Sequence, residues 1–362
     1  MKKYRKILLN PGPATTTLSV KQSQIVDDIC PRVSEFGNVI KEIRKDLTNI
    51  VANDIDYTTI LFGGSGTASV EAVISSVISS NDNLVIINNG SYGQRIVDIA
   101  KTYKINYQEF KSELYNQVDA NLLEEFIIKH KATHIVIIHN ETSTGLLNNL
   151  EVLNNIIVKY NLISIIDAMS SFGAIPIDMI TSNIDYLCSS SNKNLQGMAG
   201  ISFVVAKKSS LELIKYYEKQ TFYLDLYSQY QYLEQNNQTR FTPPVQTIYA
   251  LKQAILELNT ETVNGRYDRY KKLWSIINEE LSKMGFKTFL NEEDQSKIIT
   301  LYSLPNNIEF EKLHDYLYSY GITIYPSKFN KTSFRIANIG DLEKKDILFF
   351  LTKMNDFIDK NK

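Results

Sequence analysis

Short apolar runs alternate with helical periods between residues 57 and 207. The helical patterns have about ten residues each and begin with ASVEAVISSVI (68–78) and RIVDIAKTY (95–103). Seven apolar runs are expected to be strands: YTTILF (57–62), NLVIIN (83–88), INYQEF (105–110), THIVIIH (133–139), LISIID (162–167), IDYLCSS (184–190) and ISFVVAK (201–207). Strands separated by helices of this length predict a mostly parallel, doubly wound α/β sheet.

The pattern changes near residue 208. A tyrosine-rich stretch leads to two adjacent prolines, and two long helical patterns follow at 245–258 and about 263–284. The last part predicts a strand (297–304), a helix (310–321), a strand (333–338) and a helix from Asp341. We expect a large α/β domain over residues 15–250 and a smaller α+β domain over 251–362, with residues 1–14 packed near the smaller one.

Composition and charge narrow the class of protein. The chain has 362 residues, 39 basic and 40 acidic, so its net charge of −1 argues against a nucleic-acid partner. Its two cysteines predict free thiols in a reducing compartment, and its four histidines show no metal-ligand spacing. The apolar part of MKKYRKILLN is too short for a signal peptide, and no run approaches a membrane span of roughly 20 residues. We expect a cytoplasmic protein without a membrane partner or a metal.

The first strand ends in GGSGT (63–67), which enters a helix. Small residues permit close approach of the backbone, and the N–H groups at a helix N-terminus bind anions. The stretch lacks the third glycine of a dinucleotide fingerprint and the lysine of a P-loop. It therefore predicts a phosphate site at Ser65, Gly66 and Thr67, although a plain strand-to-helix turn explains such glycine-rich text about as often.

Four further residues follow strand ends, where doubly wound sheets bind ligands. Asp167 ends an apolar strand, Tyr92 stands in NGSYGQR, Thr142 in HNETSTG, and Lys193 in SSSNKNLQGMAG. Each has an ordinary alternative: a turn cap for Asp167 and Thr142, core packing for Tyr92, and a solvated turn for Lys193. Together with the phosphate site, however, an amine, a carboxylate and an aromatic ring compose a pyridoxal phosphate site.

The same residues also make the chain resemble a known protein family over nearly its whole length. The chain resembles the class V aminotransferases of pyridoxal phosphate fold type I, through LFGGSGTASVEAVISS, NGSYGQR, HNETSTGLLN and SFRIANIG. The narrower stretches VDDICPRVSEFG, IDAMSSFGAIPIDM and SSSNKNLQGMAG are similar to the subfamily that acts on 2-aminoethylphosphonate and pyruvate. The chain departs from that subfamily at Asn194, where cysteine is usual, and at Ala337, where glycine is usual. These departures leave every functional group in place.

The resemblance implies a role for each matching position. Lys193 and Asp167 would be catalytic, Lys193 holding the cofactor covalently and Asp167 pairing with its ring nitrogen. The remaining cofactor-binding positions would be Ser65, Gly66, Thr67, Tyr92, Thr142 and Asn192, with Thr242 reaching the cofactor of a second subunit in a homodimer. Arg335 would bind the substrate carboxylate. Beyond the resemblance, we expect Arg32 or Arg95 to be an additional partner of the phosphonate.

The implied reaction moves an amino group from 2-aminoethylphosphonate to pyruvate, giving phosphonoacetaldehyde and L-alanine. Another class V reaction, such as alanine–glyoxylate or serine–pyruvate transamination, differs only in the substrate pocket. A different class of protein, a nucleotide-binding or non-catalytic phospholigand-binding module, agrees less well with the incomplete fingerprint and with Lys193. The sequence leaves the physiological direction of the reaction open.

Overall fold

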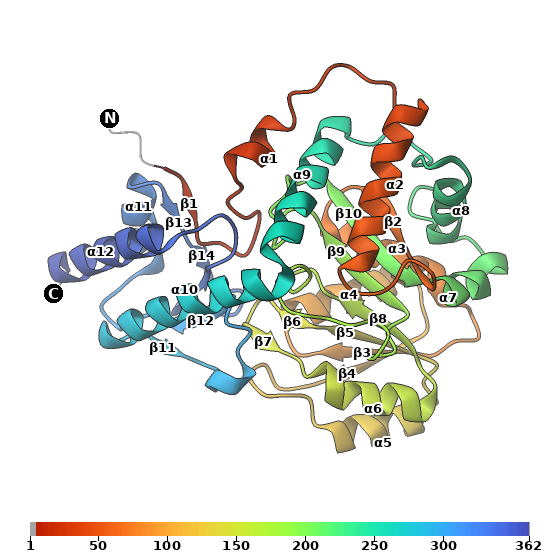
Figure 1. Ribbon diagram of the computed structural model, residues 1–362. Helices are drawn as coiled ribbons and strands as arrows, with labels where there is room; N and C mark the ends of the chain where they lie inside the picture. Colours follow the sequence, from red (N-terminus) through yellow and green to blue (C-terminus); the bar gives the residue numbers. More distant parts are fainter. Residues whose placement is uncertain (1–4, 362) are drawn as a thin grey trace.

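A seven-stranded sheet forms the centre of the computed structural model, which describes residues 5–361 (Figure 1). The spatial order of its strands is β2 (Tyr57–Gly63), β10 (Ile201–Lys207), β9 (Tyr186–Ser190), β8 (Ile163–Asp167), β5 (His134–Ile138), β3 (Leu84–Asn88) and β4 (Tyr107–Lys111). Only β10 runs antiparallel to its neighbours, and every other pair is parallel. The predicted mostly parallel α/β sheet is confirmed.

Burial explains why the inner strands are apolar along their whole length. Every residue of β5 is buried, as are the first four of β3, because helices cover a parallel sheet. The helices of this part are α2 (Ser34–Asn49), α3 (Gly66–Val77), α4 (Ser91–Thr102), α5 (Ala120–His130), α6 (Leu150–Tyr160), α7 (Lys208–Leu213), α8 (Leu226–Asn236) and α9 (Val245–Glu261). In Figure 1, α5 and α6 lie side by side at the lower edge of the molecule.

A four-stranded antiparallel sheet with its own hydrophobic core forms the second part of the molecule. Its strands, in spatial order, are β11 (Lys287–Thr288), β12 (Ile299–Ser303), β15 (Ser333–Ala337) and β14 (Tyr325–Pro326). The helices α10 (Val263–Lys283), α11 (Phe310–Ser319) and α12 (Lys344–Lys360) contribute apolar residues to this core. This is an α+β arrangement, as the sequence predicts.

The N-terminal segment joins this second part through a short strand. β1 (Ile7–Leu8) pairs in parallel with β13 (Ile322–Thr323), and Ile7 lies in the second core. The expected boundary between residues 250 and 251 falls inside α9, whose buried side chains pack with the first core. The division into domains stays a prediction.

The predicted and observed ends of elements differ by a few residues. The last helix begins at Lys344, not at Asp341, because Glu343 and Asp346 form a capping box there. Two minor elements, the hairpin of β6 (Asn140–Glu141) and β7 (Leu146–Leu147), follow β5. This hairpin shapes the loop that carries Thr142.

Candidate active site

A cavity of about 480 Å³ lies where the carboxyl ends of the central strands meet. Its volume is in the range typical of small-molecule sites. Its lining comes from the ends of β8 and β9, from the loops after β2, β8 and β9, and from the starts of α3 and α4: Gly64, Ser65, Gly66, Thr67, Val70, Tyr92, Arg95, Ile96, Asp167, Met169, Ser190, Asn192, Lys193, Ala199 and Gly200. The structure thus brings seven of the predicted cofactor-binding residues to one cavity, together with Arg95.

The N-terminus of α3 forms one wall of this cavity. Ser65 is its N-cap but makes no side-chain capping bond; the N–H of Ala68 donates to the carbonyl of Ser65 (2.9 Å), and the N–H groups of Gly66 and Thr67 are left for another acceptor. A Cβ on Gly66 would lie 2.2 Å from the sulfur of Met169, so no larger residue fits without displacing that side chain. An uncapped helix N-terminus facing a cavity suits the phosphate of a cofactor.

Lys193 lies in a tight turn between β9 and β10. The N–H of Gln196 donates to the carbonyl of Lys193 (3.0 Å), and the N-terminal segment covers the lysine stem at Gly12. The side chain keeps some exposure because it faces the cavity. Burial of the amine lowers the pKa of Lys193 to about 8, although the nearby Asp167 acts in the opposite direction. A lysine with this pKa has a sizeable neutral, nucleophilic fraction near neutral pH.

Asp167 is the last residue of β8 and is almost fully buried. One carboxylate oxygen accepts the N–H of Met169 at 2.8 Å. Burial raises the pKa of Asp167, while that hydrogen bond and the positive charges of Lys193 and Arg95 oppose the rise. A buried carboxylate beside the lysine is placed to hold a proton on a cationic ring nitrogen.

Tyr92 stands in the first turn of α4, with two cations close to its ring. The Lys193 amine lies 5.6 Å from the ring centre, and the Arg95 guanidinium lies 4.7 Å from it. Arg95 also contacts the hydroxyl of Thr67 at 3.4 Å, which places it on the side of the α3 N-terminus. The ring therefore forms a flat wall between the helix terminus and the lysine.

Glu141 is a buried acidic residue that lines neither cavity but supports the site through the backbone of Tyr92, and it was not among the predicted residues. It is fully buried, and its carboxylate accepts the N–H groups of Tyr92 (3.2 Å), Gly93 (3.4 Å) and Ser143 (3.0 Å). Burial raises the pKa of Glu141, and these donors oppose the rise. The sequence feature that could have identified Glu141 is its position directly after a buried strand, within HNETSTG. Its carboxylate fixes the start of α4 and hence the backbone that carries Tyr92.

A second cavity of about 350 Å³ shares Tyr92 and Lys193 with the first. Its other lining residues are Pro11, Gly12, Tyr325, Pro326, Ser327, Lys328 and Arg335. Arg335 is 2% exposed, and its guanidinium donates to the carbonyls of Pro326 (3.1 Å) and Thr142 (3.3 Å). Within residues 5–361 no carboxylate lies within ion-pair distance of Arg335; burial lowers the pKa of its guanidinium, and Tyr92 and the more distant Glu141 oppose this, so the cation faces the cavity without a direct ion pair.

Two predicted contacts with the cofactor are less direct. Thr142 is buried, and its hydroxyl donates to that of Ser170 at 2.9 Å, but it lines neither cavity. Asn192 lines the first cavity, and its side-chain oxygen accepts the hydroxyl of Ser190 at 2.9 Å. The roles of both residues stay predictions.

Arg32 and Thr242 lie outside both cavities. Arg32 is exposed and donates to the carbonyls of Thr239 (2.5 Å) and Arg240 (3.1 Å), so its guanidinium is engaged away from Lys193. Thr242 lies in a hollow of about 10 Å³ beside Gly63. Within one chain, neither residue meets the ligand that was predicted for it, and both assignments stay predictions.

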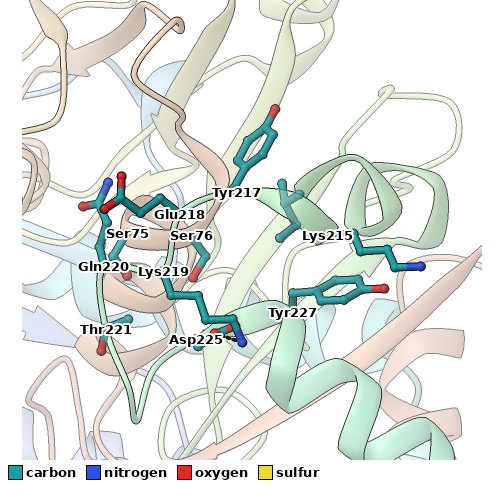
Figure 2. Close-up of a pocket in the computed structure, with 11 residues that line it drawn as sticks. Ser75, Ser76, Lys215, Tyr217, Glu218, Lys219, Gln220, Thr221, Asp225 and Tyr227 are labelled. Atoms are coloured by element: carbon teal, nitrogen blue, oxygen red, sulfur yellow. Dashed lines mark ion pairs between the residues drawn. The ribbon is translucent and has the colours of Figure 1, made fainter.

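Figure 2 shows a small hollow next to the segment that follows α7. Lys219 and Asp225 form an ion pair of 2.9 Å there, and Thr221 and Tyr227 lie beside it. Its volume of about 20 Å³ has room for one or two water molecules only. It offers no alternative to the two cavities around Lys193.

Nothing in the described part of the chain indicates a metal or a membrane span. Residues 5–361 contain no group of three or more histidine, cysteine, aspartate or glutamate side chains that could hold a metal ion. In the same range, no helix has the length and apolar character needed to cross a bilayer.

Comparisons with known proteins agree with this geometry. The family model "Aminotransferase class-V" matches residues 20–326. The chain is 40% identical over 354 residues to the 2-aminoethylphosphonate–pyruvate transaminase of Bacillus cereus (strain G9842), covering 96% of both proteins. It is also 40% identical over 361 residues to the bifunctional phosphonoacetaldehyde hydrolase/aminoethylphosphonate transaminase of Clostridioides difficile (strain 630). That match covers 98% of this chain but 56% of the longer relative.

A solved structure supports the fold independently. The alanine–glyoxylate aminotransferase of Nostoc sp. superimposes with a TM-score of 0.92 at 22% sequence identity, covering 98% of this chain and 96% of that one.

Proposed function

The chain belongs to the class V aminotransferase family, and from this premise we propose that it transfers the amino group of 2-aminoethylphosphonate to pyruvate. The products would be phosphonoacetaldehyde and L-alanine, and the reaction is reversible. The name of the 40% identical relative, which is matched over 96% of both chains, supports this substrate pair.

Class V aminotransferases depend on pyridoxal phosphate, and the residues of the first cavity fit that cofactor. The uncapped N-terminus of α3 would hold the phosphate, Tyr92 would face the ring, and Asp167 would pair with the ring nitrogen. When bound, the cofactor withdraws electrons from the carbon that carries the amino group.

Side chains of this protein would carry out the proton transfers of this reaction. Lys193 Nζ, partly neutral because its pKa is about 8, would take a proton from the substrate carbon and return it during amino transfer. The carboxylate of Asp167 would hold a proton on the ring nitrogen. Arg335 would bind the carboxylate of pyruvate or alanine through its planar guanidinium.

The observation that carries the proposal is the buried Arg335 at the wall of a cavity that also contains Lys193. A buried guanidinium without a carboxylate partner is costly unless an anion joins it. It therefore favours an anionic substrate next to the amine over a neutral one.

Two measurements test the function. Protein purified with pyridoxal phosphate should show a visible absorption band that Lys193→Ala lacks, and borohydride reduction should abolish this band while attaching the cofactor irreversibly to the protein. Mixed with 2-aminoethylphosphonate and pyruvate, it should form alanine and an aldehyde in equal amounts. A protein that takes up no cofactor, or that accepts alanine and glyoxylate but not the phosphonate, would contradict the proposal.

We further propose a cytoplasmic homodimer in which Thr242 contacts the cofactor of the other subunit. Thr242 is exposed in this chain, and both cysteines are free thiols. Sedimentation of the protein would measure its oligomeric state.

A further inference from the structure

The loop after β14 closes the outer side of the second cavity. Together with β14 it contributes Tyr325, Pro326, Ser327 and Lys328 to the lining. The hairpin is fixed at its base, because β14 pairs with β15 and the N–H of Ser327 donates to the carbonyl of Ser333 at 3.2 Å. β14 itself holds the Arg335 guanidinium through the carbonyl of Pro326. Lys328 is thus carried on a short, anchored loop beside Arg335.

The charge of this cavity is entirely positive. Its basic lining residues are Lys193, Lys328 and Arg335, and none of its lining residues is acidic. Lys328 is exposed, and no ion pair or hydrogen bond engages its amine within residues 5–361. One of the three cations, Lys193, is needed as the nucleophile. The other two face the same space: Lys328 has no hydrogen bond within the described part of the chain, and Arg335 donates from Nε and Nη1 to backbone carbonyls.

A carboxylate and a phosphonate make different demands on such a space. A carboxylate has one charge and two oxygens, which one guanidinium satisfies through two parallel hydrogen bonds. A phosphonate, like a phosphate monoester, has three acceptor oxygens and, once its second proton is lost, two negative charges. A second cation therefore adds more to the binding of the phosphonate than to that of the carboxylate.

We propose that Lys328 is a specificity-determining residue that supplies the second positive charge for the phosphonate, while Arg335 serves both substrates. This inference rests on the proposed function. The two arginines suggested by the sequence are less suited, because Arg32 is engaged outside the cavities and Arg95 lines the cofactor side. Of the basic side chains in the second cavity, Lys328 is the one without another assigned task.

The test compares Lys328→Met with Lys331→Met in the cofactor-loaded enzyme. Lys331 is exposed on the same hairpin but does not line the cavity, so it is a matched control. Methylphosphonate and acetate serve as probes whose dissociation constants are measured by calorimetry, without turnover. Lys328→Met should weaken methylphosphonate binding about tenfold more than acetate binding, and Lys331→Met should change neither. Lys328→Arg should restore most of the preference.

The same variants are assayed for kcat/KM with 2-aminoethylphosphonate and with L-alanine. A selective loss with the phosphonate amine supports the role of Lys328. Equal losses for both probes, or no loss for methylphosphonate, would overturn it. A wild-type enzyme that does not turn over 2-aminoethylphosphonate would refute the proposed function, whereas the calorimetric comparison would still decide whether Lys328 selects a dianion.

Discussion

The amine of Lys193 lies 5.6 Å from the centre of the Tyr92 ring. The two residues lie about 100 positions apart in the sequence, Tyr92 in the first turn of α4 and Lys193 in the turn after β9, and both line the two cavities. This relationship places a flat aromatic wall beside the nucleophile, between the cofactor side and the substrate side. A planar ring attached to Lys193 would lie against that wall.

The lowered pKa of Lys193 predicts how the cofactor-free enzyme takes up pyridoxal phosphate. Only the neutral amine attacks an aldehyde, and the amine loses its proton as the pH rises through about 8. The rate of uptake should therefore rise about tenfold per pH unit below 8 and level off above it. Stopped-flow absorbance measures this rate. A rate that keeps rising to the ordinary lysine pKa of 10.5 would contradict the burial argument.

Replacing Arg335 by lysine should impair carboxylate binding. Lysine keeps the charge but loses the planar pair of donors, and it no longer reaches the carbonyls of Pro326 and Thr142 together. We expect the KM for pyruvate to rise about 10- to 100-fold. Steady-state kinetics measure this, with thermal unfolding to show that the variant is folded. An unchanged KM would remove Arg335 from the substrate site.

Glu141→Gln tests the anchoring of α4. The glutamine amide would turn a donor toward the backbone N–H groups of Tyr92 and Gly93 or toward that of Ser143, leaving buried donors unsatisfied. We expect a loss of about 1–3 kcal/mol in the free energy of unfolding. Urea denaturation measures it.

The control for that variant is Glu151→Gln. Glu151 is exposed in the first turn of α6, where Asn149 already caps the helix. Its replacement should change the free energy of unfolding by no more than about 0.5 kcal/mol. Equal effects of the two variants would show that the buried carboxylate has no special part in anchoring α4.

Gly12→Ala should disturb Lys193 directly. Gly12 has a φ of +142°, and an added Cβ would lie 3.2 Å from Cγ of the lysine. The backbone strain should lower the free energy of unfolding by about 1–3 kcal/mol. The contact with the lysine side chain should slow cofactor uptake. Gly285→Ala is the matched control, since Gly285 has a φ of +91° and nothing within 4 Å of an added Cβ. That control should lose stability and keep the normal rate of uptake.

The sequence alone determined the sheet and the loops that carry the chemistry. Apolar runs such as those of β5 and β8 identify buried strands, because only helix-covered strands are apolar on both faces. Residues that follow such strands share one edge of a parallel sheet, so Asp167 and Lys193 were predictable neighbours. The small residues of GGSGT likewise identified the N-terminus of α3 as a phosphate site.

The tertiary structure decided which distant groups join that edge. Glu141 accepts bonds from residues about 50 positions away, Gly12 lies against Lys193, and Lys328 enters the cavity from the second sheet. Arg32, although basic and near the N-terminal motifs, binds the backbone of residues 239 and 240 instead. Periodicity reports which face of an element is buried, but the packing of one part on the other sets which side chains meet, and no local pattern encodes that.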